Sequence, residues 1–113
     1  MTTTVGTHLI ANVYDVDPVL LEKLEMGLPL LHAIVEELGL HVVEKAGHQF
    51  TPFGYTYAFV LSESHFTIHT YPEHRSCFID IFCCNKDFNS EYAVACIMKH
   101  FKTNSIAHQT IIR

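Results

Sequence analysis

Apolar residues between Leu24 and Leu38 recur every three or four positions, which is the spacing of one face of an α-helix. Asp17-Pro18 precedes this stripe as an N-cap residue followed by a proline at the first helical position. Gly39 follows the stripe, where a glycine commonly ends a helix. Because Gly27 and Pro29 interrupt the stripe, we expect a helix that begins late or forms in two pieces.

The other apolar runs contain alternating, β-branched and aromatic residues, a pattern that predicts β-strands. Turn signals at Gly47 and at Pro52-Phe53-Gly54 separate two of these runs. Asn89-Ser90-Glu91 marks the start of a second helix. The expected strands cover residues 6–13, 40–45, 55–61, 66–71, 77–84 and 105–112. The order β-α-β-β-β-β-α-β predicts an α+β fold, a two-layer α/β sandwich with a mainly antiparallel sheet and two helices on one face.

One face of this sheet is left without helices, so it must be either solvated or covered by a partner. The strands carry more large apolar side chains than a free face should expose. These side chains are Tyr57, Phe59, Phe66, Ile68, Phe78 and Phe82. We therefore expect the chain to form a homodimer through its sheet.

Composition narrows the class of protein. Of the 113 residues, 49% are hydrophobic and 17% are charged, so the chain can bury a hydrophobic core. We expect one folded domain that spans residues 1–113. The net charge of −5 and the scattered basic residues argue against nucleic-acid binding. No apolar run approaches the roughly 20 residues of a membrane helix, and the N-terminus lacks a signal-peptide pattern. We therefore expect a cytoplasmic protein that does not bind membranes.

The segment from Leu61 to Glu73 concentrates hydroxyl, imidazole and carboxylate side chains between apolar neighbours. A serine oxygen can attack the preceding peptide carbonyl and convert the amide into an ester, which breaks by β-elimination and leaves a dehydroalanine that hydrolyses to a pyruvoyl group. This reaction also needs a histidine for proton transfer and a hydroxyl that stabilises the intermediate. Ser64, His69 and Thr56 carry these groups. Alternatively, Ser64 caps a turn and the other two are ordinary strand residues.

Two other chemistries fit these residues less well. His65 and His69 are four positions apart, which on a strand separates them by about 13 Å, too far for one metal ion. Cys84 with His69 could form a nucleophile pair for hydrolysis, but no nearby pattern marks an oxyanion hole. The four cysteines include no Cys-x-x-Cys pair and suit neither a structural zinc site nor a disulfide framework. We therefore expect no bound metal.

Residues 62–73, Ser-Glu-Ser-His-Phe-Thr-Ile-His-Thr-Tyr-Pro-Glu, closely resemble the processing-site motif of the prokaryotic S-adenosylmethionine decarboxylases. Pro52-Phe53-Gly54 is similar to that family's Pro-aromatic-Gly turn, and Ile79 to Cys84 is similar to its Asp-x-Phe-x-Cys strand. Gly6 to Leu9 and the chain length also match. The family fold is a two-layer sandwich that forms homodimers with the sites near the interface, which agrees with the predicted order of elements.

The resemblance implies a self-processing, pyruvoyl-dependent lyase. The bond between Glu63 and Ser64 would be cut, giving a β fragment of residues 1–63 and an α fragment of residues 64–113 that begins with a pyruvoyl group made from Ser64. His69 matches the processing histidine, and Thr56 falls where the family usually has a serine that assists processing. Cys84 matches the cysteine that returns a proton to the substrate carbon after the Schiff base between substrate and pyruvoyl group has lost CO2.

The resemblance also implies a small-molecule substrate, S-adenosylmethionine, whose decarboxylated product feeds spermidine biosynthesis. Phe50 and Tyr71 fall where the family places aromatic side chains beside adenine, and Tyr71 replaces the more usual tryptophan. Glu73 matches an acidic residue that holds the ribose or the substrate. A changed pocket on the same scaffold could act on ornithine or arginine instead, and an unprocessed chain would be a non-catalytic member of the family.

Overall fold

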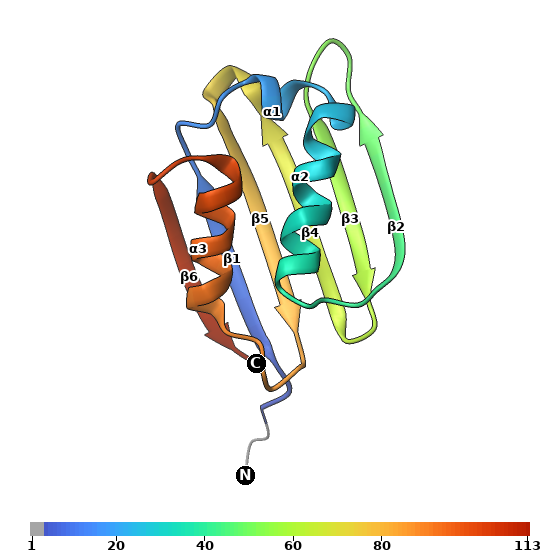
Figure 1. Ribbon diagram of the computed structural model, residues 1–113, viewed down its shortest axis with the longest axis vertical. Helices are drawn as coiled ribbons and strands as arrows, with labels where there is room; N and C mark the ends of the chain where they lie inside the picture. Colours follow the sequence, from blue (N-terminus) through green and yellow to red (C-terminus); the bar gives the residue numbers. More distant parts are fainter. Residues whose placement is uncertain (1–3) are drawn as a thin grey trace.

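The computed structural model describes residues 4–113 as a six-stranded sheet with its helices packed on one face (Figure 1). The strands are β1 (Thr7–Val13), β2 (Val42–Gln49), β3 (Tyr55–Leu61), β4 (Ser64–Tyr71), β5 (Ser76–Cys83) and β6 (Ile106–Ile112). The helices are α1 (Val19–Glu22), α2 (Leu24–Glu37) and α3 (Ser90–Phe101), and a 3-10 turn, η1, covers Pro72–His74. All neighbouring strands are antiparallel, in the order β2-β3-β4-β5-β1-β6. The predicted α+β sandwich is confirmed.

The first predicted helix forms in two pieces. Lys23 has extended backbone angles, φ −119° and ψ 129°, and separates α1 from α2. The N-cap of α1 is Pro18 and not Asp17. Gly27 is required where α2 crosses β3, because a Cβ at this position would lie 1.9 Å from the hydroxyl oxygen of Tyr55. The predicted helix is therefore broken at Lys23, and the glycine at position 27 is explained by the close approach of α2 to Tyr55 in the sheet.

The strand predicted at residues 40–45 is displaced, and the turn predicted at Gly47 is wrong. Because β2 runs from Val42 to Gln49, Gly47 lies inside the strand and pairs with Tyr57 of β3. A Cβ on Gly47 would stand 2.2 Å from a ring carbon of Tyr57. Glycine occurs in this strand because an aromatic ring lies over the backbone, which sequence alone does not distinguish from a turn.

Alternate residues of the central strands fill the core between the sheet and the helices. Tyr57, Phe59, Phe66 and Ile68 on β3 and β4 are all buried in this core. The rings of Phe59 and Phe66 meet edge to face, with centroids 5.5 Å apart. The prediction that these four side chains crowd the opposite face is wrong, because strand alternation directs all of them towards the helices.

The sheet face without helices, here called the open face, carries the other half of each strand. On β3, β4 and β5 its residues are Thr56, Ala58, Val60, His65, Thr67, His69, Tyr71, Phe78, Asp80 and Phe82. Val60 is 51% exposed and Phe78 is 39% exposed in the single chain. The open face is thus a mixture of aromatic, aliphatic and imidazole side chains, and not a purely apolar surface.

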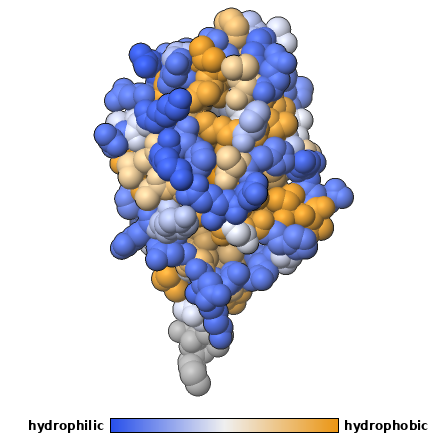
Figure 2. All heavy atoms as spheres, viewed as in Figure 1, coloured by the Kyte–Doolittle hydropathy of each residue, from blue (hydrophilic) through white to orange (hydrophobic). Residues whose placement is uncertain are grey.

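The outer surface of the helix layer is mostly hydrophilic, with apolar groups showing between the helices (Figure 2). The buried stripe of α2 contains Leu31, Ile34 and Val35, and α3 buries Val94 and Ile97. No helix within residues 4–113 is both long and apolar enough to cross a membrane. The helices therefore cover one face of the sheet and leave the chemistry-bearing strand residues on the other.

Thr70 is a buried polar residue that links β4 to α1 and to the start of β3. Its hydroxyl donates to the Leu21 carbonyl at 2.8 Å and accepts from the Tyr55 amide, also at 2.8 Å. The Tyr55 hydroxyl donates to the Leu20 carbonyl at 2.7 Å. These hydrogen bonds fix α1 against the C-terminal end of β4.

Thr70→Val should lower the free energy of unfolding by about 2–3 kcal/mol, because a side chain of the same shape leaves a buried amide and a buried carbonyl unpaired. Urea unfolding followed by circular dichroism measures this change. Thr67→Val lies on the same strand but on the open face, and this control should shift stability by less than about 1 kcal/mol. Equal stability of the two variants would contradict the role assigned to Thr70.

Candidate active site

Ser64 and Cys84 come together at one end of the sheet. Leu61 of β3 pairs directly with Ser64 of β4, so Ser62 and Glu63 form the tight turn between these strands. The Oγ atom of Ser64 lies 3.3 Å from the Sγ atom of Cys84. The backbone N–H of Cys84 donates to the Glu63 carbonyl at 3.1 Å. The carbonyl that the serine would have to attack is therefore already polarised by a backbone donor.

The backbone at Ser64 adopts a conformation that is uncommon for residues other than glycine, with φ at 154°. Such angles occur where the surrounding structure holds the chain against its local preference, and they are frequent at reactive sites. In this chain the unusual angle falls on the residue whose preceding peptide bond the sequence motif marks for cleavage.

Cys83 and Cys84 have different surroundings, as strand alternation predicts. Cys83 is only 3% exposed and faces the helix layer, and burial raises the pKa of its thiol. Cys84 is half-buried and contacts Ser64. Of the two neighbouring thiols, Cys84 is the one that reaches the candidate cleavage site.

Thr56 and His69 form a second group at the other end of β4. They are paired residues on β3 and β4, and the Oγ1 atom of Thr56 lies 2.9 Å from Nδ1 of His69. Ser64 begins the same strand five positions before His69, which corresponds to about 16 Å along an extended chain. Within one chain, the structure does not bring the predicted processing histidine to the predicted cleavage site.

A cavity of about 510 Å³ lies beside Thr56 and His69, a volume typical of small-molecule sites. Its lining residues include all three predicted substrate contacts, Phe50, Tyr71 and Glu73. The structure therefore groups the five predicted residues at this end into one concave surface. With three aromatic side chains, Phe53 among them, and one carboxylate, this surface can bind a flat ring and a positively charged group.

Two of the aromatic side chains of this cavity pack against neighbours in other elements. Tyr71 packs against Phe78 of β5, with ring centroids 5.3 Å apart. Phe50 packs against His48 of β2 at 4.7 Å. Because η1 begins at Pro72, directly after β4, it turns the chain so that Glu73 also lines the cavity.

Gln49 is a positioning residue that sequence reasoning missed. Its side-chain oxygen accepts from the Leu24 amide at 2.6 Å. Its side-chain nitrogen donates to the carbonyls of Glu22 at 2.8 Å, Gly54 at 2.9 Å and Phe50 at 3.1 Å. These bonds tie the turn that carries Phe50 to the junction of α1 and α2. No local pattern marks this role, because the partners lie up to 27 positions away in the chain.

Two further histidines lie nearer to Ser64 than His69 does along the sheet. His65 follows Ser64 directly, and its ring centroid lies 6.2 Å from that of His8 on β1. Both rings also approach Phe82, at 6.1 Å and 5.9 Å. The Nε2 atom of His8 is buried and has no hydrogen-bond partner among the described residues. Sequence reasoning considered His65 only as a metal ligand and did not assign a role to His8.

The fold agrees with that of a solved enzyme structure. The chain is similar to the adenosylmethionine decarboxylase of Aquifex aeolicus VF5, with a TM-score of 0.89 and 29% sequence identity. The similarity covers 99% of this chain and 92% of the other. The chain therefore has the same two-layer α+β sandwich fold as that decarboxylase.

The family follows from sequence comparison. The model of the S-adenosylmethionine decarboxylase family matches residues 7–113, and the chain belongs to this family. It is 35% identical to the S-adenosylmethionine decarboxylase proenzyme of Clostridium botulinum strain Langeland over 108 residues, which are 96% of this chain and 93% of that protein. It is 32% identical to the proenzyme of the same name from Picrophilus torridus, over 100% of this chain and 87% of that protein.

Proposed function

We propose that this chain is the precursor of a pyruvoyl-dependent decarboxylase that converts S-adenosylmethionine into decarboxylated S-adenosylmethionine and CO2, and so supplies spermidine biosynthesis. Family membership supports the reaction class. The observation that carries the proposal is the contact of Ser64 and Cys84 beside the polarised carbonyl of Glu63. An unprocessed, non-catalytic chain would have no use for this arrangement.

Cleavage begins when the Ser64 oxygen attacks the Glu63 carbonyl carbon and the peptide bond becomes an ester. Negative charge develops on the carbonyl oxygen during this step, and the Cys84 N–H at 3.1 Å can stabilise it in the manner of an oxyanion hole. The unusual φ of Ser64 favours the reaction, because breaking the amide releases a constrained backbone. The residues present therefore fit the formation of a pyruvoyl group from Ser64.

The ester breaks when a base removes the Cα proton of Ser64. Residue 63 leaves as a carboxylate at the end of the β fragment, residues 1–63, of which the first three lie outside the described residues. The dehydroalanine left at position 64 takes up water and releases ammonia, which completes the α fragment, residues 64–113. His69 is the proposed base, and Thr56 orients its ring through the 2.9 Å contact.

His69 and Thr56 can act on Ser64 only if they come from a second copy of the chain, since about 16 Å separates the two groups within one chain. Two chains packed through their open faces, with strands running in opposite directions, would place the Ser64 end of one against the His69 end of the other. A twofold dimer of this kind forms two equivalent composite sites. A second cavity, of about 310 Å³ beside Cys84, would then adjoin the partner's aromatic cavity.

The aromatic cavity supports S-adenosylmethionine as the substrate. Phe50 and Tyr71 expose 46% and 42% of their surface in the single chain, which leaves ring faces free to stack on adenine. Glu73 offers a carboxylate for the ribose hydroxyls or the cationic part of the substrate. Ornithine and arginine have no ring that would use this aromatic pair.

Release of CO2, measured separately with S-adenosylmethionine, ornithine and arginine, tests the substrate. We expect turnover of S-adenosylmethionine alone. Turnover of ornithine or arginine at a comparable kcat/KM would overturn the assignment of substrate but not of chemistry. A cleaved protein that releases no CO2 from any of the three would refute decarboxylation itself.

Cys84 is the proposed proton donor. The pyruvoyl ketone, when formed, supplies the electron sink for loss of CO2. The Cys84 thiol, already beside residue 64, can then deliver a proton to the substrate carbon. A proton delivered to the pyruvoyl carbon instead would turn residue 64 into alanine and inactivate the enzyme.

Cys84→Ala should still be cleaved, because alanine keeps the backbone N–H that polarises the Glu63 carbonyl. Its kcat should fall by about 10²-fold or more. N-terminal sequencing of the α fragment should find alanine accumulating at position 64 during turnover. Cys83→Ala removes the neighbouring buried thiol and is the matched control, with kcat close to that of the wild type. A Cys84 variant as fast as this control would contradict the assignment.

A further inference from the structure

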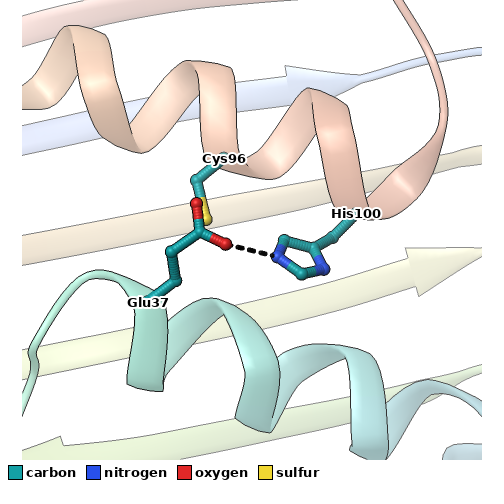
Figure 3. A group of neighbouring side chains, drawn as sticks. All are labelled: Glu37, Cys96 and His100. Carbon is teal, nitrogen blue, oxygen red and sulfur yellow. Dashed lines mark hydrogen bonds and ion pairs between the residues drawn. The ribbon is translucent and has the colours of Figure 1, made fainter.

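Glu37, Cys96 and His100 form a cluster between the helices α2 and α3 (Figure 3). Cys96 and His100 are four positions apart on α3, so their side chains leave the same face of the helix. Glu37 is the last residue of α2 and reaches across to them. One ligand-type atom from each of the three side chains lies within 4.8 Å of the other two.

The carboxylate of Glu37 forms hydrogen bonds with three side chains of α3. Its Oε1 atom accepts from Lys99 Nζ at 2.7 Å and contacts His100 Nε2 at 3.0 Å, and its Oε2 atom accepts from the Tyr92 hydroxyl at 3.2 Å. The hydrogen bond from Lys99 and, to a smaller extent, the one with His100 lower the pKa of Glu37 to about 2. The carboxylate is therefore ionised at neutral pH. A negative charge at the C-terminus of a helix opposes the helix dipole, which makes this position attractive to cations.

Cys96 lies beneath this carboxylate, with 2% of its surface exposed. Burial, with a further contribution from the nearby Glu37, raises the pKa of its thiol to about 11. The thiol must lose its proton to become a metal ligand.

We propose that Glu37, Cys96 and His100 bind a Zn²⁺ ion that joins α2 to α3. A carboxylate oxygen, a thiolate sulfur and an imidazole nitrogen are the ligand types that Zn²⁺ prefers, and a water molecule completes its tetrahedral shell. On binding, the metal ion replaces Lys99 beside Glu37. The Lys99 ammonium, 61% exposed, moves into solvent, and the Cys96 thiol gives up its proton to become a thiolate ligand. Because the cluster lies on the helix layer, the ion would stabilise the fold without taking part in catalysis.

Isothermal titration with ZnCl2 tests the site, with thermal unfolding as a second readout. Wild-type protein should bind about one Zn²⁺ per chain, and Tm should rise by about 5–10 °C at a hundredfold excess of Zn²⁺ over Kd. His100→Gln should weaken binding at least about 100-fold, because it removes a direct ligand. His41→Gln removes an exposed histidine elsewhere and is the matched control, with Kd unchanged.

Co²⁺ reports directly on the sulfur ligand. Wild-type protein loaded with Co²⁺ should show a near-ultraviolet thiolate-to-cobalt charge-transfer band. Cys96→Ala should abolish this band and Cys84→Ala should retain it. The reverse result would place the metal at the candidate active site and overturn the inference, as would the absence of any band.

Lys99→Gln separates a metal site from a simple ion-pair network. It removes the cation that competes for Glu37, so Zn²⁺ should bind about two- to fivefold more tightly than to the wild type. An ion-pair network without a metal function predicts no gain in Zn²⁺ affinity. Unchanged or weaker Zn²⁺ binding by Lys99→Gln would therefore refute the proposal.

Discussion

Ser64→Ala should leave the chain uncut. The alanine side chain has no oxygen to attack the Glu63 carbonyl, so no ester forms and no pyruvoyl group can arise. The purified variant should run as one full-length species on a denaturing gel, and release of CO2 from S-adenosylmethionine should fall to the background rate. This substitution should abolish activity completely, because it removes both the cleavage and the cofactor.

Ser62→Ala is the matched control for this experiment. It removes a hydroxyl from the same turn, two positions earlier, but leaves the Ser64 oxygen next to Cys84. We expect it to be cleaved and active. Cleavage of the Ser64 variant, or loss of cleavage in the Ser62 variant alone, would show that the nucleophile has been misassigned.

His69→Ala should also block cleavage on its own, and co-expression with Ser64→Ala should rescue it. In a mixed dimer, one composite site combines the Ser64 of the His69 variant with the His69 of the Ser64 variant. That site contains every proposed group, so only the chain with His69→Ala should be cut. Tagging the two variants differently identifies the cleaved chain by mass.

The alternative is cleavage within one chain by a histidine close to Ser64. His65 is the candidate for this role, since it is next in sequence and contacts His8. If His65 is the base, His65→Ala should be uncut, and His69→Ala should be cleaved without any partner. Either of these results would contradict the composite site, as would cleavage of His69→Ala chains kept monomeric by dilution.

Much of the fold could be predicted from the sequence, because each element carries its own local signal. Asn89 caps α3, since its side-chain oxygen accepts a hydrogen bond from the Tyr92 amide, as its residue type predicts. The turn predicted at Gly47 was wrong, because this position is a glycine for another reason: the ring of Tyr57, ten positions away in the chain, leaves no room for a Cβ. A sequence shows that a residue is small but not whether a turn or a neighbouring side chain requires it.

The identities of the candidate site residues could be proposed from a motif, but not their separation into two groups. The rise per residue that separates His65 from His69 by about 13 Å also separates Ser64 from His69 by about 16 Å. The predicted strand began only at residue 66, so this separation became evident when the structure showed that β4 starts at Ser64. The hydrogen bond from the Cys84 N–H to the Glu63 carbonyl could not be predicted either, because every residue except proline has a backbone N–H.

The two cavities and Gln49 could not be predicted, because they depend on contacts between distant segments. The cavity beside His69 joins the turn after β2 to the start of η1, which lie about twenty residues apart in the chain. Gln49 holds that turn through four hydrogen bonds to residues on both sides of it. Only the folded sheet brings these segments to one end.

The intact mass of the wild-type protein shows whether the chain cuts itself between Glu63 and Ser64. Purified protein should give two species, a β fragment that ends at Glu63 and an α fragment that begins at position 64 with a pyruvoyl group in place of serine. The pyruvoyl group also blocks N-terminal sequencing of the α fragment until it is converted to alanine. A single full-length species with an unmodified Ser64, stable on prolonged incubation, would show that the chain does not cut itself and has no pyruvoyl group.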